Sequence, residues 1–103
     1  MRTLRFKVNA QKIQKSGDFS GIVSGTAGYL KAEFAFSKEW SGMVKVAEFR
    51  EKWGKIFTSA KIVNNQCIIP QEVLSGIQWT VKVIGKRGDV ILTTEECIVT
   101  QEV

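Results

Sequence analysis

Histidine is absent from the 103 residues of the sequence. Its absence removes the usual general base of enzymes, the commonest metal ligand and the usual partner of a serine or cysteine nucleophile. We therefore expect a protein without enzymatic activity, without catalytic residues and without a cofactor.

Cysteine is scarce, and neither Cys67 nor Cys97 has a second cysteine or a histidine at zinc-binding spacing. Each cysteine lies in an apolar, strand-like run, where a free thiol behaves as a small hydrophobic group. We predict two buried, unbridged thiols and no metal site, as is typical of a reducing cytosol.

Long apolar runs are also missing, because no stretch approaches the roughly 18 residues that cross a membrane. The N-terminus alternates charged and apolar residues and lacks the apolar core of a secretory signal. These two absences predict a cytosolic chain without membrane contact.

The composition is that of a globular protein, with 44% hydrophobic and 24% charged residues. A chain of this length can bury one core, so we expect a single domain over residues 1–103. Its formal charge of +5 is spread along the sequence without a run of five like charges. This spread favours an ordinary solvated surface over a dedicated nucleic-acid patch.

Alternation of apolar and polar residues with a period of two recurs along the chain, whereas helical periodicity is lacking. The alternation predicts strands at residues 4–8, 30–36, 43–49, 56–63, 66–69, 77–83, 90–93 and 95–101, with turns and one short strand between 11 and 28. Apolar residues change parity within 43–49, which favours a bulge there. The core residues expected from these strands are Leu30, Phe34, Phe36, Trp40, Ile77, Trp79, Val81 and Val83.

Short breaks separate these strands. Ser37 to Gly42 predicts a single helical turn, and Asn64-Asn65 predicts a two-residue hairpin loop because asparagine tolerates positive φ. Gly85 to Asp89 is expected to be a loop. About seven or eight strands at this spacing indicate an all-β, antiparallel two-sheet sandwich or a small barrel.

Two candidate chemical motifs favour structural interpretations. The glycines at 21, 25 and 28 lack the Gly-Lys-Ser/Thr ending of a phosphate-binding loop, so a connection between strands is expected. Glu95 and Glu96 are adjacent, so in a strand they point to opposite faces and cannot flank one substrate atom. We expect both carboxylates to be solvated.

Aromatic and basic residues alternate between Phe49 and Phe57, and basic residues recur in the Gly85–Asp89 loop. Such a segment is either a stacking and phosphate-contact surface for single-stranded nucleic acid or a hairpin tip with amphipathic side chains. The candidate interaction surface comprises Arg50, Lys52, Trp53, Lys55, Lys86 and Arg87.

A set of short patterns is distributed from about Leu30 to Val99, a range that is most of the chain: Phe34-x-Phe36-Ser37-x-Glu39-Trp40-x-Gly42, Lys45-x-Ala47-x-Phe49, Cys67-Ile68-Ile69-Pro70-x-Glu72-Val73-Leu74, Trp79-x-Val81-x-Val83-x-Gly85 and Leu92-Thr93-Thr94. In these patterns the chain resembles small modules encoded in the tail regions of phages and prophages of Gram-positive bacteria, including the N-terminal domains of baseplate and tail-fibre proteins. The resemblance implies an immunoglobulin-like β-sandwich, and it identifies no catalytic or ligand-binding residue.

The function implied by the resemblance is that of a non-enzymatic structural or assembly protein of a phage or prophage tail. Its partners would be virion proteins or further copies of itself, and it would reside in the bacterial cytoplasm during expression and then in the virion. Because the sequence ends at Val103, without the fibre region of larger baseplate proteins, receptor recognition is not expected. The alternative is a phage-encoded binding protein of another class, either an inhibitor of a host defence system or a nucleic-acid binder.

Overall fold

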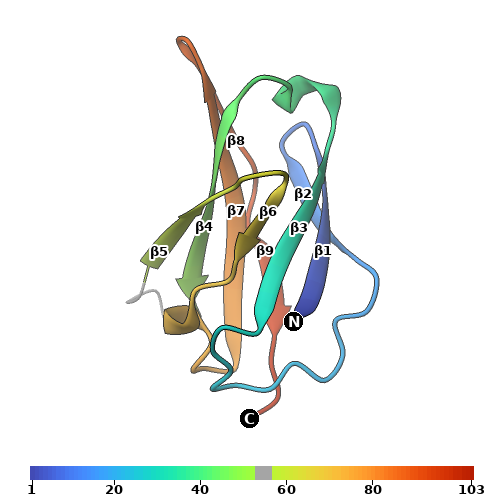
Figure 1. Cartoon of the computed structure of the whole chain (residues 1–103), viewed down its shortest axis with the longest axis vertical. Helices are drawn as coiled ribbons and strands as arrows, with labels where there is room; N and C mark the ends of the chain where they lie inside the picture. Colours follow the sequence, from blue (N-terminus) through green and yellow to red (C-terminus); the bar gives the residue numbers. More distant parts are fainter. Residues whose placement is uncertain (53–56) are drawn as a thin grey trace.

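The structure of the protein, a computed structural model, describes residues 1–52 and 57–103. In this part of the chain, nine strands form two sheets that face one another (Figure 1). The strands are β1 (Arg2–Asn9), β2 (Lys12–Ser16), β3 (Leu30–Phe36), β4 (Val44–Glu51), β5 (Phe57–Lys61), β6 (Gln66–Ile68), β7 (Gln78–Arg87), β8 (Val90–Thr93) and β9 (Cys97–Thr100). The predicted all-β two-sheet sandwich is confirmed.

The first sheet has the strand order β2-β1-β3-β6, and the second has the order β5-β4-β7-β8, with β9 also paired to β7. The pairs are antiparallel except for β1 and β3, which run parallel. Single 3₁₀ turns, η1 (Lys38–Trp40) and η2 (Gln71–Val73), lie where the chain passes between the sheets. The predicted helical turn after Ser37 is thus confirmed.

The core lies between the sheets, and a row of aromatic rings runs along the first sheet within it. Neighbouring ring centroids in this row are 5.3 to 5.6 Å apart, in the order Phe19, Phe6, Phe34, Phe36 and Trp40. Such distances are typical of favourable offset or edge-to-face contacts. Of the residues predicted for the core, those that are buried are Leu30, Phe34, Trp40, Trp79, Val81 and Val83.

The other two predicted core residues differ from expectation. Phe36 is only partly buried at the end of β3, where Lys45 covers its ring with Nζ 5.1 Å from the centroid. Ile77 is 42% exposed because β7 begins only at Gln78, so Ile77 precedes the strand that would hold it over the core.

Trp40 fixes two connections at one end of the sandwich. Its indole N–H donates to the carbonyl of Ala10 at 3.0 Å, which ties η1 to the β1–β2 turn. Its ring lies against Gly85, where an added Cβ would come within 2.8 Å of Trp40 and of Met43 Sδ. Gly85 is therefore required because the β7 backbone passes directly over the indole.

Buried Gln101 plays a similar part at the other end. Its Oε1 accepts a hydrogen bond from Trp79 Nε1 at 3.1 Å, and its Nε2 donates to the carbonyls of Leu74 at 3.1 Å and Gly76 at 2.8 Å. One amide thus binds three polar groups, of which the Trp79 N–H and the Gly76 carbonyl would otherwise lack a partner, while the Leu74 carbonyl also accepts the Gly25 N–H at 2.8 Å.

The Asn64-Asn65 turn is confirmed in the predicted form. Asn64 and Asn65 have φ values of 54° and 62°, and the turn is closed by a bridge between Val63 and Gln66. Two successive positive φ values define a type I′ turn, for which asparagine is favoured.

Two sequence predictions about the strands are wrong. Residues 11–28 contain a regular strand, β2, which the alternation missed because Ile13 is its one buried apolar residue. The bulge expected in 43–49 is absent from β4 as described, since its register with β7 is continuous from Val44 to Glu51. The change of parity instead reflects apolar side chains on the outer face of the sheet.

Candidate interaction surfaces

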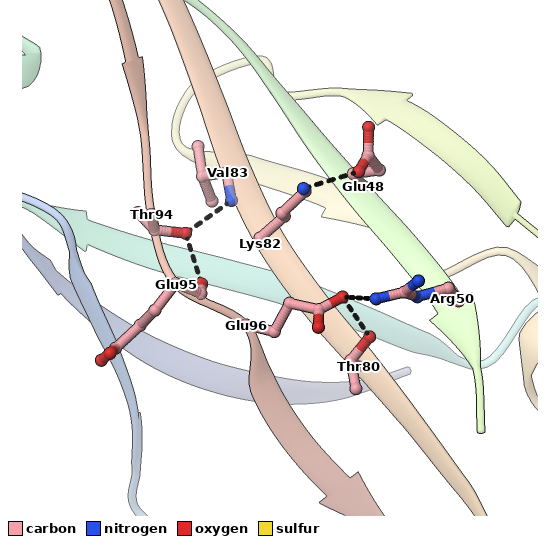
Figure 2. A network of polar contacts seen from close by, with 8 residues as sticks. All are labelled: Glu48, Arg50, Thr80, Lys82, Val83, Thr94, Glu95 and Glu96. Atoms are coloured by element: carbon pink, nitrogen blue, oxygen red, sulfur yellow. Dashed lines mark hydrogen bonds and ion pairs between the residues drawn. The ribbon is translucent and has the colours of Figure 1, made fainter. Parts of the chain in front are cut away.

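The outer face of the five-stranded sheet carries a network of charged side chains from β4, β7 and the β8–β9 connection (Figure 2). Lys82 Nζ lies 3.4 Å from a carboxylate oxygen of Glu48, its cross-strand neighbour. Arg50 forms an ion pair with Glu96, and the Thr80 hydroxyl donates to the same carboxylate at 3.2 Å. Because its charges are matched in pairs, this central region attracts ions of either sign only weakly.

Thr94 lies in the short connection between β8 and β9, which also contains Glu96. Its Oγ1 accepts a hydrogen bond from the Val83 N–H at 2.9 Å and donates to the Glu95 carbonyl at 2.8 Å. The Thr94 hydroxyl thus accepts the Val83 N–H of β7 in place of a backbone carbonyl, at the point where β8 has ended and β9 has not yet begun. Figure 2 shows the side chains of Glu95 and Glu96 directed away from each other. Both carboxylates are exposed as expected, and Glu96 is in addition bound by Arg50 and Thr80.

One end of the same face is apolar. Val44 of β4 pairs with Lys86 of β7, which in turn pairs with Ile91 of β8, so these three side chains form one row across the sheet. In the next outward row, Val46 of β4 pairs with Ile84 of β7. Val44 and Ile91 are 62% and 64% exposed. We call the four side chains Val44, Val46, Ile84 and Ile91 the apolar end of the sheet.

The tip of the β7–β8 hairpin projects past the rest of the sandwich, as Figure 1 shows at the top of the molecule. The expected loop from Gly85 to Asp89 is shorter than predicted: β7 continues to Arg87, and only Gly88 and Asp89 form the turn, with Gly88 at a φ of 60°. The predicted loop was too long because the parity of β7 continues through Gly85, whose lack of a side chain reflects its contact with Trp40.

The hairpin leaves part of its edge open. In a two-residue hairpin the pair next to the turn, here Arg87 and Val90, exchanges both backbone hydrogen bonds. Alternation then directs the N–H and C=O of Ile91 away from β7. The next outward carbonyl, that of Thr93, accepts a hydrogen bond from Gln11 Nε2 at 3.2 Å, which agrees with this pattern.

Of the predicted interaction residues that the structure describes, Arg50 and Lys86 lie apart. Arg50 and Lys86 share the outer face of the five-stranded sheet, but they pair with Thr80 and Val44, six positions apart on β4 or about 20 Å. Arg87 donates from Nη1 to the Ser41 carbonyl at 2.6 Å and thereby ties the hairpin to η1. Lys52 is exposed just after β4, and Trp53 and Lys55 lie outside the described residues.

Both cysteines are buried as predicted, and both are free thiols. Burial raises the pKa of the Cys67 thiol to about 12. Burial also raises the pKa of Cys97, against the opposing effect of nearby Lys15. The neutral thiol is therefore the stable form at physiological pH, and such cysteines react slowly.

We expect a thiol reagent at pH 8 to modify two cysteines in the denatured protein and neither cysteine in the folded protein on the same time scale. Counting modified thiols by mass spectrometry, without reductant, makes the measurement. Fewer than two reactive thiols after denaturation would contradict the free state of Cys67 and Cys97.

The same burial gives the thiols a defined effect on stability. The folded state raises the pKa of Cys67 from 9.0 to about 12. Between these pH values the thiol ionises in the unfolded chain but stays neutral in the folded protein. The free energy of unfolding is therefore unaffected by this thiol below pH 9 and falls as the pH rises towards 12. The conservative variant Cys67→Val should therefore lose stability less steeply over this range than the wild type.

Neither a metal site nor a membrane-spanning helix is found in the part of the chain that the structure describes. Within residues 1–52 and 57–103, no three histidine, cysteine, aspartate or glutamate side chains are grouped to hold a metal ion. In the same residues, no helix has the length and apolar character needed to cross a bilayer.

Comparison with known proteins gives no relative from which to infer function. No protein-family model matches the chain, and no curated protein or solved structure is significantly similar to it. The resemblance to phage tail modules therefore remains a prediction.

Proposed function

We propose that the protein is a non-enzymatic structural or assembly protein of a phage or prophage tail and acts through protein–protein contacts. The observation that carries this proposal is the β7–β8 hairpin, which combines an open strand edge at Ile91 with the exposed apolar end of the sheet. Open edges and exposed apolar side chains are the features that sheets use to associate. The resemblance in the sequence agrees with such a role.

The geometry of β8 fits a second copy of the chain. Two β8 strands can pair antiparallel about a two-fold axis at Ile91, so that the outward N–H and C=O of each Ile91 bind the other copy. The two five-stranded sheets would then continue into one, with both Ile91 side chains adjacent on the outer face. This pairing requires no change in the β7–β8 ladder.

The open edge is short, so the pair should be weak on its own. A stable interface buries on the order of 1,000 Å² or more, and β8 contributes only four residues. We therefore expect a dimer with a dissociation constant of about micromolar or weaker. Such contacts become strong when many copies are arrayed in one assembly.

Sedimentation velocity over a concentration series tests this proposal. The wild type should form a dimer as concentration rises, and Ile91→Lys should remain a monomer because a charge replaces the apolar contact at the two-fold axis. Ile98→Lys is the matched control, since Ile98 is 52% exposed on the same face but pairs with Thr80, six positions along β7 from Lys86, the partner of Ile91. A wild type that stays monomeric, or an Ile91→Lys variant that dimerises like the control, would contradict the proposal.

A further inference from the structure

The outer face of the four-stranded sheet carries a line of basic side chains. Leu4, Phe6 and Val8 of β1 point into the core, so the odd-numbered residues of β1 and their cross-strand partners point outwards. Four of these outward positions are basic, and we call them the basic stripe: Lys31, Arg5, Lys7 and Lys12.

The stripe follows β1 along its length. Lys31 pairs with Thr3, and Lys12 pairs with Asn9, so the four cations stand at four successive outward levels of β1. Successive levels are about 7 Å apart, which makes the stripe about 20 Å long. Lys31 thus joins Arg5, Lys7 and Lys12 in a regular row, although the four residues form no continuous run of charges in the sequence.

The charges of the stripe are only partly matched. Arg5 Nε lies 3.2 Å from Glu33, and Lys31 Nζ donates to Gln66 Oε1 at 3.1 Å. Among residues 1–52 and 57–103, neither Lys7 nor Lys12 forms an ion pair, and both are exposed. This face therefore differs from the five-stranded sheet, where Glu48 and Glu96 neutralise two of the cations.

A shallow pocket of about 360 Å³ opens beside the middle of the stripe. Arg5, Lys7, Glu33 and Ala35 line it, together with the hydroxyl-bearing Ser16 and the amides of Asn64 and Asn65. The Asn65 carbonyl accepts the Phe34 N–H at 2.8 Å, which holds the turn against β3. The pocket thus joins a small apolar side chain, hydrogen-bonding groups, two cations and one carboxylate, that of Glu33, which pairs with Arg5.

We propose that this face binds single-stranded nucleic acid, with the phosphodiester backbone along the basic stripe and one unstacked base in the pocket. A row of cations at regular spacing matches a chain of phosphates better than a single anion. The amide and hydroxyl groups can bind the polar edge of a base only when that base is unpaired and free of the stack, which favours a single strand over a duplex. The site lies on the sheet opposite the proposed assembly surface and does not depend on it.

Fluorescence anisotropy with a labelled mixed-sequence oligonucleotide of about 12 nucleotides tests this inference. Four phosphate contacts predict a slope of log affinity against log salt of about −2.8, so affinity should fall about 20-fold between 50 and 150 mM salt. A duplex of the same sequence should bind more weakly than the single strand.

The paired variant Lys7→Ser/Lys12→Ser should bind at least tenfold more weakly and halve the slope. The control, Lys38→Ser/Lys61→Ser, removes the same charge from exposed positions outside the stripe and should bind like the wild type. Sedimentation velocity shows whether both variants associate as the wild type does, which separates a failure of this inference from a failure of the assembly proposal.

Three results would overturn the inference. The first is no binding at about 50 mM salt. The second is an equal loss of affinity in the Lys7/Lys12 and Lys38/Lys61 variants, which would show that binding depends on the net charge of the protein and not on the basic stripe. The third is a duplex that binds as tightly as the single strand.

Discussion

Replacement of Phe34 by alanine is expected to lower the free energy of unfolding by about 3–5 kcal/mol. Phe34 is 2% exposed and is the middle ring of the aromatic row, with Phe6 and Phe36 at 5.5 and 5.6 Å between centroids. Truncation would therefore remove two ring contacts and leave a cavity that the paired strands β1 and β3 cannot close. A loss of this size is a large share of the stability of a small domain.

Urea denaturation followed by tryptophan fluorescence measures the effect. The control is Phe57→Ala, since Phe57 is 57% exposed and its removal should cost less than about 1 kcal/mol. Equal losses in the two variants would contradict the register of β3, because a one-residue shift would exchange its core and solvent faces.

Replacement of Gln101 by leucine is expected to lower the free energy of unfolding by about 2 kcal/mol or more, although leucine is apolar and of similar volume. The change leaves the Trp79 N–H and the Gly76 carbonyl without their partner, whereas the Leu74 carbonyl keeps its hydrogen bond from the Gly25 N–H. Each buried group left unpaired costs about 1–3 kcal/mol. The hydrogen bonds of Gln101 therefore outweigh the gain from a more apolar side chain.

Gln11→Leu is the matched control for this variant. Gln11 Nε2 also donates to a backbone carbonyl, that of Thr93, but its side chain is exposed and water can replace it. We expect a loss below about 1 kcal/mol for Gln11→Leu. A Gln101→Leu protein as stable as this control would show that the amide of Gln101 does not support Trp79 and η2.

Much of the fold can be predicted from the sequence because most strands have one buried and one solvated face. The alternation in 4–8, 30–34 and 79–83 places its apolar residues in the core as expected. The Asn64-Asn65 turn and the 3₁₀ turn after Ser37 are also correct, because local backbone preferences determine both. These features depend on neighbours within a few residues.

The errors arise where a distant part of the chain decides the outcome. β2 is held by its pairing with β1, and its alternation is weak because Lys15 occupies an inward position and covers the Phe19 ring. Val44 and Val46 lie on the outer face because Ala47 and Phe49 fill the core positions of β4. When a strand carries apolar residues on both faces, a period-two pattern cannot show which face packs against the second sheet.

The candidate surfaces were harder to predict than the fold. The apolar end combines residues of β4, β7 and β8, and the basic stripe combines residues of β1, β2 and β3, so neither forms a run in the sequence. Gln101 gave no signal, because its role depends on carbonyls about 25 residues away. Strand register is the information that the sequence alone lacks.

The assembly proposal is tested most directly by hydrogen exchange of the wild-type protein at low and high concentration, read at single amides by NMR. We predict that the Ile91 amide exchanges freely in the monomer and becomes protected as concentration rises, because it then donates to the second copy. The Leu92 amide, which the alternation directs towards β7, should be protected at both concentrations. An Ile91 amide whose exchange does not change with concentration would contradict the proposed pairing of β8.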